Sequence, residues 1–236
     1  MEILYEDNHI IAVNKACGEL VQSDITNERT IVDETKDYLK EKYNKPGNVF
    51  VGLPHRLDRP TSGIVLLAKT GKALDRLNKL FSERDSITKT YWAVVDNRPP
   101  KHTDILEHYL KKNQEQNKSY AYPEGTPYAK YARLTYRHVA SLKNNHLLEI
   151  ELYTGRHHQI RVQLGMINLR IRGDVKYGYP RPNKYRGIHL HARKLEFIHP
   201  VKKTPIAIIA EPPEDKVWNE YIKLFRENQF SPVIPV

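Results

Sequence analysis

The sequence predicts an α+β protein with a mainly antiparallel, mixed β-sheet core flanked by helices and loops. Short apolar runs of strand length recur along the 236 residues, and several of them follow one another directly. Only four segments repeat apolar residues at helical spacing, and they do not alternate regularly with the strands. Strand-like sequence continues on both sides of the polar segment 99–127, so we expect one domain spanning residues 1–236.

Seven short apolar runs are typical of strands. They cover residues 10–13, 63–68, 91–95, 134–140, 147–153, 188–190 and 206–210. The two runs on either side of Asn144 and Asn145 are separated by a short polar stretch. Because asparagine tolerates the left-handed conformation of a tight turn, these two runs predict a hairpin.

Four segments predict helices. Thr70 is placed to cap a helix in which Ala73, Leu77 and Phe81 share one buried face. Apolar residues also favour helices over 31–42, 156–167 and 217–225. The segment 99–127 is polar and rich in Lys, Asn and Gln, so we expect a surface excursion or a flexible loop there.

Positive charge is concentrated in one part of the chain. Lys and Arg number 38 against 28 Asp and Glu, which gives a formal net charge of +10. The segment 156–203 holds twelve basic residues and only two acids, Asp174 and Glu196, and so accounts for the whole excess. A local positive surface of this kind favours a polyanion as the partner.

Composition also bears on location. A single cysteine, Cys17, cannot form an internal disulfide, which favours a reducing compartment. The N-terminal residues include acids and lack the apolar core of a signal peptide. The longest charge-free apolar runs, 63–68 and 205–210, are far shorter than the roughly 20 residues that cross a bilayer. We therefore expect a cytoplasmic protein with no membrane partner.

The sequence HRLDRPTSG, at residues 55–63, is the densest group of reactive side chains. Pro60 and the final glycine shape a turn, and the Thr61 hydroxyl is placed to hydrogen-bond nearby backbone. Asp58 lies between two arginines, which favour its ionised form. An ionised aspartate in a loop can act as a nucleophile. An ordinary turn residue paired with arginine fits the same pattern.

A second cluster, TGRHHQIRVQL, covers residues 154–164. If this cluster is helical, His157 and Arg161 are four residues apart and share a face. Arg161 is then able to pair with a carboxylate distant in sequence. A basic helix start that is only a solvated surface fits the pattern equally well.

Signatures of other chemistries are missing. The sequence contains neither the phosphate-binding pattern GxxxxGK[ST] nor the dinucleotide-binding pattern GxGxxG. The histidine pairs 157/158 and 189/191 have no further ligands at metal-binding spacing. We therefore expect no metal, no nucleotide cofactor and no other cofactor.

Together, the two clusters resemble motifs of the RluA family of pseudouridine synthases. HRLDRPTSG is similar to that family's catalytic motif, whose nucleophile maps onto Asp58. KTYWAV at 89–94 is similar to its KxYxA motif, whose tyrosine, here Tyr91, lies against the target base. GRHHQIR resembles its GRxHQIR motif, whose last arginine, here Arg161, pairs with the catalytic aspartate. Further similarities follow to residue 200, so the match covers nearly the whole chain in family order.

Three positions depart from the family's pattern. Ala16 stands where proline is usual, His157 replaces a serine or threonine, and Gln163 stands where histidine is common. None of them removes a residue of the chemistry, so we expect them to affect the choice of substrate. The chain begins almost directly at the catalytic domain, so we expect a stand-alone catalytic domain without the N-terminal S4-like RNA-binding domain of many relatives.

The resemblance implies the pseudouridine synthase fold and the isomerisation of specific uridines to pseudouridine in structured ribosomal or transfer RNA. Asp58 would attack the sugar or the base, or abstract a proton, while Arg161 keeps it ionised and oriented. Tyr91 would stack on a uracil that is flipped out of its stem, and Arg56 would fill the vacated place. The other RNA-binding candidates are His55, Thr61, Arg156, Lys176, Arg181 and Arg186. We expect RNA as the partner and a monomeric enzyme.

Two other functions fit part of the pattern. A non-catalytic RNA-binding or RNA-chaperone module could keep the same scaffold, although an intact Asp58, Tyr91 and Arg161 favour an enzyme. A nucleoside hydrolase or glycosidase would act on small molecules. A simple glycosidase usually uses a second carboxylate as general acid, and the Asp58 loop supplies only one.

Overall fold

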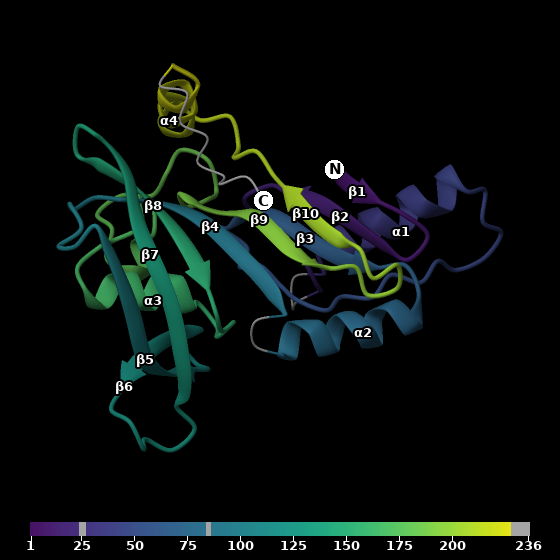
Figure 1. Ribbon diagram of the computed structural model, residues 1–236, viewed down its shortest axis with the longest axis horizontal. Helices are drawn as coiled ribbons and strands as arrows, with labels where there is room; N and C mark the ends of the chain where they lie inside the picture. The colour runs from purple at the N-terminus through teal and green to yellow at the C-terminus, as the bar shows by residue number, and fades with distance from the viewer. Residues whose placement is uncertain (24–26, 84–85, 228–236) are drawn as a thin grey trace. The chain divides into compact units, whose positions relative to one another are not determined.

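The computed structural model describes residues 1–23, 27–83 and 86–227, and its strands and helices confirm the α+β class (Figure 1). The chain forms two compact units. The first contains residues 1–89, 185–187 and 192–211, and the second contains the remainder. Each unit draws on distant parts of the sequence, and the expectation of one domain over residues 1–236 stays a prediction.

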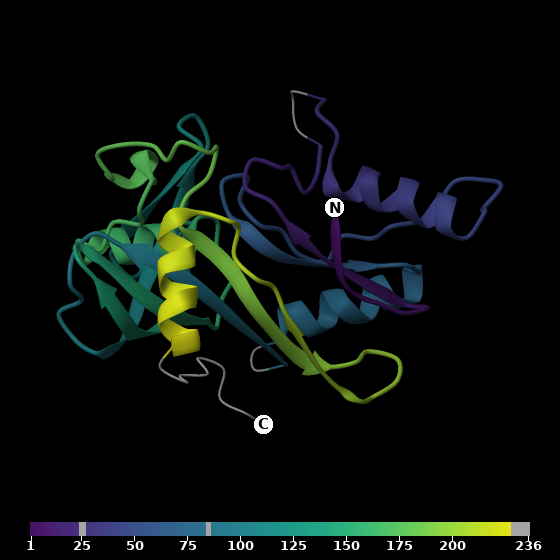
Figure 2. The same ribbon diagram turned by 90° about the horizontal axis from the view of Figure 1, so that it is seen from above.

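The first unit is a β-sheet with two helices. Strands β1, β2, β3 and β9 are neighbours in that order, and β10 pairs with β9. Figure 1 and Figure 2 show α1 and α2 beside the strands of this unit. The elements are β1 (Glu2–Glu6), β2 (Ile10–Lys15), α1 (Ile31–Lys42), β3 (Ser62–Ala68), α2 (Gly71–Ser82), β9 (Leu190–Ile198, in this unit from residue 192) and β10 (Pro205–Ile209).

Local sequence explains where the two helices of the first unit begin. The Thr30 hydroxyl accepts the Asp33 N–H at 3.2 Å, and the Asp33 carboxylate accepts the Thr30 N–H at 3.2 Å, which forms a capping box on α1. Thr70 caps α2 by accepting the Ala73 N–H at 3.2 Å, as the sequence predicts. Ala73 and Leu77 then pack against alternate residues of the sheet, among them Ile10.

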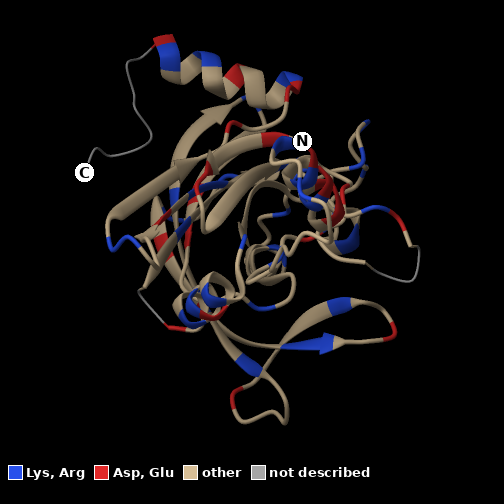
Figure 3. Ribbon diagram, turned by 90° about the vertical axis from the view of Figure 1, so that its right-hand side faces the viewer, with Lys and Arg blue, Asp and Glu red and all other residues tan. Residues whose placement is uncertain are grey.

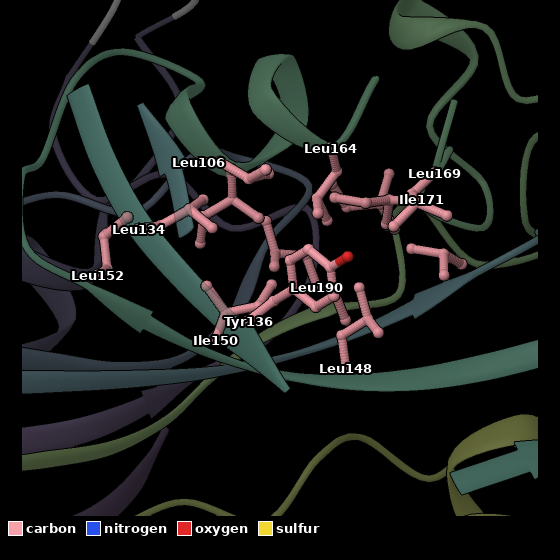
Figure 4. Packing of buried hydrophobic residues seen from close by; sticks show 14 residues of the cluster. Leu106, Leu134, Tyr136, Leu148, Ile150, Leu152, Leu164, Leu169, Ile171 and Leu190 are labelled. Carbon is pink, nitrogen blue, oxygen red and sulfur yellow. The ribbon is translucent and has the colours of Figure 1, made fainter. Parts of the chain in front are cut away.

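The second unit is an antiparallel sheet in the order β4, β8, β7, β5, β6. Its elements are β4 (Ile87–Val95, in this unit from residue 90), β5 (Thr103–Asn113), β6 (Lys118–Tyr122), β7 (Lys130–Leu142), β8 (Asn145–Leu152), α3 (Gln159–Met166), the short 3-10 helix η1 (Val175–Tyr177) and α4 (Lys216–Glu227). Figure 4 shows the larger of its apolar clusters, to which α3 contributes Ile160 and Leu164. Trp92 and Val94 of β4 join Trp218 of α4 in a separate cluster.

The hairpin predicted around Asn144 is confirmed, since β7 pairs with β8 and Leu142 lies opposite Asn145. The residue in the left-handed conformation is Lys143, with φ of 54°, rather than an asparagine. The prediction of a strand at 188–190 is wrong in its bounds, because β9 begins at Leu190 and continues to Ile198.

The interpretation of segment 99–127 as an excursion or flexible loop is wrong, because β5 and β6 occupy most of it. In β5 only Leu106 and Leu110 are buried, and polar side chains fill the positions between them. Apolar residues four apart give a weak strand signal, and this strand is stabilised by pairing with β7 rather than by its own composition.

The predicted helix over 156–167 is also shorter than expected. His158 has φ of 55°, a left-handed conformation that a helix cannot contain, and α3 begins only at Gln159. His157 therefore precedes the helix, and the expectation that His157 and Arg161 share a helical face is wrong. Among the described residues, none of the helices combines the length and the apolar character that a membrane span requires.

Gly63 is the second residue of the buried strand β3, which follows the Asp58 loop. Its φ is +114°, a region that other residues rarely adopt. A Cβ at this position would lie 2.3 Å from the carbonyl oxygen of Ala192 and 2.6 Å from its nitrogen. These are backbone atoms of the neighbouring strand, so they cannot move aside as a side chain would.

We expect Gly63→Ala to lower the free energy of unfolding by roughly 3 kcal/mol or more, through overpacking and an unfavourable φ. Urea unfolding of the purified variant measures this loss. Gly71→Ala is the matched control, because nothing lies within 4 Å of a Cβ there and the change removes chain entropy only from the unfolded state. Equal stability of the two variants would contradict the proposed clash.

Candidate active site

The loop that carries Asp58 is joined to β3. The Asp58 carbonyl oxygen accepts the Thr61 N–H at 3.0 Å, which closes a turn just before the strand. At the start of the loop, the His55 ring stacks on Phe81 with centroids 4.4 Å apart. Its Nε2 accepts the Leu66 N–H of β3 at 2.9 Å. Burial, together with the charge of Lys89, lowers the pKa of His55 to about 3, so its ring is neutral and able to accept this bond.

Lys15 fixes the same loop from the end of β2. Its side chain is fully buried, and its Nζ donates to the carbonyl oxygens of Ala16 at 2.9 Å, Glu19 at 3.0 Å and Arg59 at 3.1 Å. Burial lowers the pKa of Lys15 to about 8, although the charges of Cys17, Glu19 and Asp58 act in the opposite direction. One ammonium group thus satisfies three carbonyls, one of them directly after Asp58.

A second connection joins the same two segments. The Gly18 N–H donates to the Arg59 carbonyl oxygen at 2.8 Å, and the Arg59 Nε donates to the Gly18 carbonyl oxygen at 3.0 Å. Sequence reasoning missed Lys15. Lys15 alternates with Ile11 and Val13 on one buried face of the strand. Because lysine is rarely buried without a partner, this pattern indicates a lysine with a specific role.

Three other predicted site residues lie in the first unit. Arg56 is exposed. Thr61 is buried, and among the described residues its hydroxyl has no hydrogen-bond partner, contrary to the expected bond to nearby backbone. Arg186 is exposed beside Gly18, since a Cβ on this glycine would lie 3.5 Å from the Arg186 Cβ. A direct RNA contact by any of them, or by His55, stays a prediction.

Arg161 and Asp174 form a buried ion pair in the second unit. The Arg161 Nε donates to Oδ2 of Asp174 at 2.7 Å, and Nη2 donates to Oδ1 at 2.8 Å. The side chains are only 5% and 1% exposed. Two parallel bonds of this kind fix the plane of the guanidinium group, which carries three further N–H donors. Pairing of Arg161 with Asp58 stays a prediction, and Asp174 was not among the predicted site residues.

Gln159 organises the turn that leads into α3. Its Oε1 accepts the Thr154 hydroxyl at 2.7 Å and the Arg156 N–H at 3.0 Å, while its Nε2 donates to the Arg133 carbonyl oxygen at 3.1 Å. The Arg156 Nε donates to the carbonyl oxygen of Tyr131 at 2.9 Å, so this RNA-binding candidate is tied to β7. The turn therefore positions α3, and with it Arg161, against the sheet.

Tyr91 lies on β4, half-buried, and packs against the apolar cluster of Figure 4. It is opposite Ile150 of β8 in the strand register. The ring is thus supported by the sheet. Of the remaining RNA-binding candidates, Lys176 and Arg181 belong to the second unit and are both exposed.

Gln163, a departure from the family pattern, is fully buried. Its Nε2 donates to the carbonyl oxygens of Leu106 at 2.8 Å and Ala132 at 3.2 Å, and lies 3.1 Å from Nδ1 of His108. It therefore joins α3 to β5 and β7 and has a structural role in the core. His157, another departure, lies 2.8 Å from the Ser119 hydroxyl of β6 through its Nδ1.

Comparison with known proteins identifies the family of this chain. The family model described as RNA pseudouridylate synthase matches residues 9–165. Ribosomal large subunit pseudouridine synthase D of Zymomonas mobilis is 32% identical over 225 residues, which cover 91% of this chain and 70% of that protein. tRNA pseudouridine synthase C of Vibrio vulnificus is 29% identical over 242 residues, with 95% of each chain covered.

The fold has a solved counterpart as well. The structure of human RNA pseudouridylate synthase domain containing 4 matches with a TM-score of 0.77 over 95% of this chain and 93% of that chain, at 22% identity. The family model spans the Asp58 loop, Tyr91 and Arg161. The chain therefore belongs to the RNA pseudouridylate synthase family, in its RluA branch, and isomerises uridine to pseudouridine in RNA.

Proposed function

We propose that Asp58 is the nucleophile of this isomerisation, with Arg161 and Tyr91 as its catalytic partners. The observation that carries the proposal is the fixed position of the Asp58 loop. Lys15 and His55 hold its two sides through buried polar bonds, while the Asp58 side chain is itself only half-buried. A preorganised loop that presents one carboxylate suits nucleophilic catalysis better than a solvated turn does.

The reaction breaks the bond between the sugar C1′ and the uracil N1 and forms a bond between C1′ and C5. N1 gains a proton and C5 loses one, so no electrons are exchanged with a cofactor. Asp58 serves either at the sugar or at the base. Arg161 stabilises the ionised carboxylate, and Tyr91 stacks on the flipped uracil, a contact worth roughly 1–3 kcal/mol.

We further propose that the substrate is a structured ribosomal or transfer RNA. The relatives named above act on one or the other, and the excess of basic residues over 156–203 is suited to a phosphate backbone. Arg56, exposed at the start of the Asp58 loop, is placed to fill the space left by a flipped base. We also propose that residues 1–236 act as a single, monomeric catalytic domain in the cytoplasm.

Pseudouridine mapping across total RNA tests this function. Cells that lack the protein should lose pseudouridine at one or a few positions, and wild-type protein should restore them. Asp58→Asn should leave them unmodified, with a rate at least about a thousandfold lower on the purified RNA. Pseudouridine restored by Asp58→Asn would exclude Asp58 as nucleophile, and release of free uracil by the wild type would indicate a hydrolase.

Lys15→Met tests the buried ammonium group that holds the loop. Lys15 titrates near pH 8 in the folded protein and near 10.5 in the unfolded chain. Between these values the unfolded state binds more protons, so the stability of the wild type relative to Lys15→Met rises with pH, by up to about 1.4 kcal/mol per unit. Urea unfolding of both proteins from about pH 7 to 10 measures the difference. A difference that does not change with pH would contradict a lowered Lys15 pKa.

Asp174→Asn tests the ion pair that positions Arg161. We expect a loss of about 3–5 kcal/mol in the free energy of unfolding, because a buried guanidinium is left without its counter-charge. The single-turnover rate should also fall at temperatures where the variant remains folded. Asp104→Asn is the control in the same unit, because its partner Lys101 is exposed and such pairs contribute up to about 1 kcal/mol. Similar losses in both variants would refute a special role for the buried pair.

A further inference from the structure

The β5–β6 hairpin is fastened to the segments around Arg161. The Ser119 N–H of β6 donates to the Tyr177 hydroxyl at 2.9 Å, and the Ser119 hydroxyl lies 2.8 Å from Nδ1 of His157. In the turn of the hairpin, the Asn117 carbonyl oxygen accepts a bond from Nζ of Lys176 at 3.1 Å. A hairpin with a largely polar sequence is thereby held in one position beside α3 and η1.

Three lysines gather at this junction, and we call them the hairpin lysines: Lys112, Lys118 and Lys176. Lys112 lies opposite Ser119 in the strand register, and Lys118 precedes Ser119. Figure 3 shows basic segments on both strands of this hairpin. The Lys118 Nζ is 5.0 Å from the ring centroid of Tyr177, and the Arg161 Cζ is 4.9 Å from the same centroid. Lys118 and Arg161 therefore contact one shared ring, and Lys112 and Lys176 lie at the same junction.

Among the residues that the structure describes, none neutralises the hairpin lysines. Within the described part of the chain, no carboxylate forms an ion pair with any of them, and Asp174 is bound to Arg161. Glu115, in the turn of the same hairpin, is exposed and forms no ion pair with them. Lysines elsewhere in the structure do have carboxylate partners, for example Lys69 with Glu6 at 2.7 Å.

The positive charge of these lysines contributes to a lowered pKa of His158. The pKa of His158 falls to about 2, first because the ring is buried and then because Arg161, His157, Lys176 and Lys112 surround it. Its neutral Nδ1 lies 2.9 Å from the Tyr177 hydroxyl. Local positive potential without a protein counter-charge is the condition in which an external anion binds.

We propose that Lys112, Lys118 and Lys176 bind phosphate groups of the RNA backbone next to the target uridine. The inference rests on the proposed function, because Arg161 locates the target nucleotide and the Tyr177 ring joins Lys118 to Arg161. Lysine is a point charge with flexible reach, which suits phosphodiesters in any sequence. The hairpin lysines thus increase the affinity for RNA and position the RNA strand, while the choice of uridine depends on other contacts.

RNA binding by Lys112→Gln/Lys118→Gln tests this proposal. All proteins carry Asp58→Asn, so that no product forms, and the probes are unmodified transcripts of large-subunit ribosomal RNA and of transfer RNA. We expect Kd to rise roughly tenfold at about 150 mM salt. The slope of log K against log salt should fall by about 2, one for each lost phosphate contact. With Asp58 restored, KM should rise while kcat stays within about twofold, as expected for lost ground-state contacts.

Lys143→Gln is the matched control. It removes one positive charge, where the double variant removes two, from an exposed lysine of the same unit in the β7–β8 turn at the opposite end of β7, and should change neither Kd nor slope. The proposal would be overturned if the double variant had the same Kd and salt slope as this control while both kept the wild-type melting temperature. Failure of the wild type to form pseudouridine in any RNA would instead refute the proposed function. In either case, the slope of log K against log salt tests whether the hairpin lysines bind phosphate groups.

Discussion

The buried ion pair between Arg161 and Asp174 is the interaction on which the second unit depends most. Removing two charges from water costs several kcal/mol for each, and the two parallel hydrogen bonds between them contribute to offsetting that cost. The pair therefore tolerates little displacement. It locks α3 to the segment of η1, and Tyr177, which contacts Arg161, passes that constraint on to the β5–β6 hairpin.

In the first unit, the buried ammonium group of Lys15 holds the Asp58 loop in position. The Asp58 loop has few apolar residues to pack, so polar bonds must hold it, and Lys15 supplies three of them from the end of a buried strand. In both units a buried cation fixes backbone that has no regular secondary structure. Buried hydrogen bonds from a charged group hold such backbone in one position. A substitution that removes one partner leaves a buried polar group unpaired, so these sites are sensitive to small changes.

Features with local causes could be predicted from the sequence, and features with distant causes could not. Helix α1 and helix α2 follow from caps and apolar spacing within a dozen residues, and Asp58, Tyr91 and Arg161 lie in short motifs. Strands β5 and β6 were missed because their burial depends on β7, α3 and η1. Asp174 was missed for the same reason, since its partner is distant and nothing in its neighbours announces a buried carboxylate.

The contact between His157 and Ser119 joins the β5–β6 hairpin to the segment that leads into α3. His157 reaches Ser119 of the hairpin through its Nδ1 and also stacks on His158, whose Nδ1 lies 2.9 Å from the hydroxyl of Tyr177, the ring beside Arg161. A change at position 157 or 119 therefore acts on the hairpin and, through His158 and Tyr177, on the surroundings of Arg161. The hairpin and the segment that carries Arg161 are thus one coupled region rather than two independent ones.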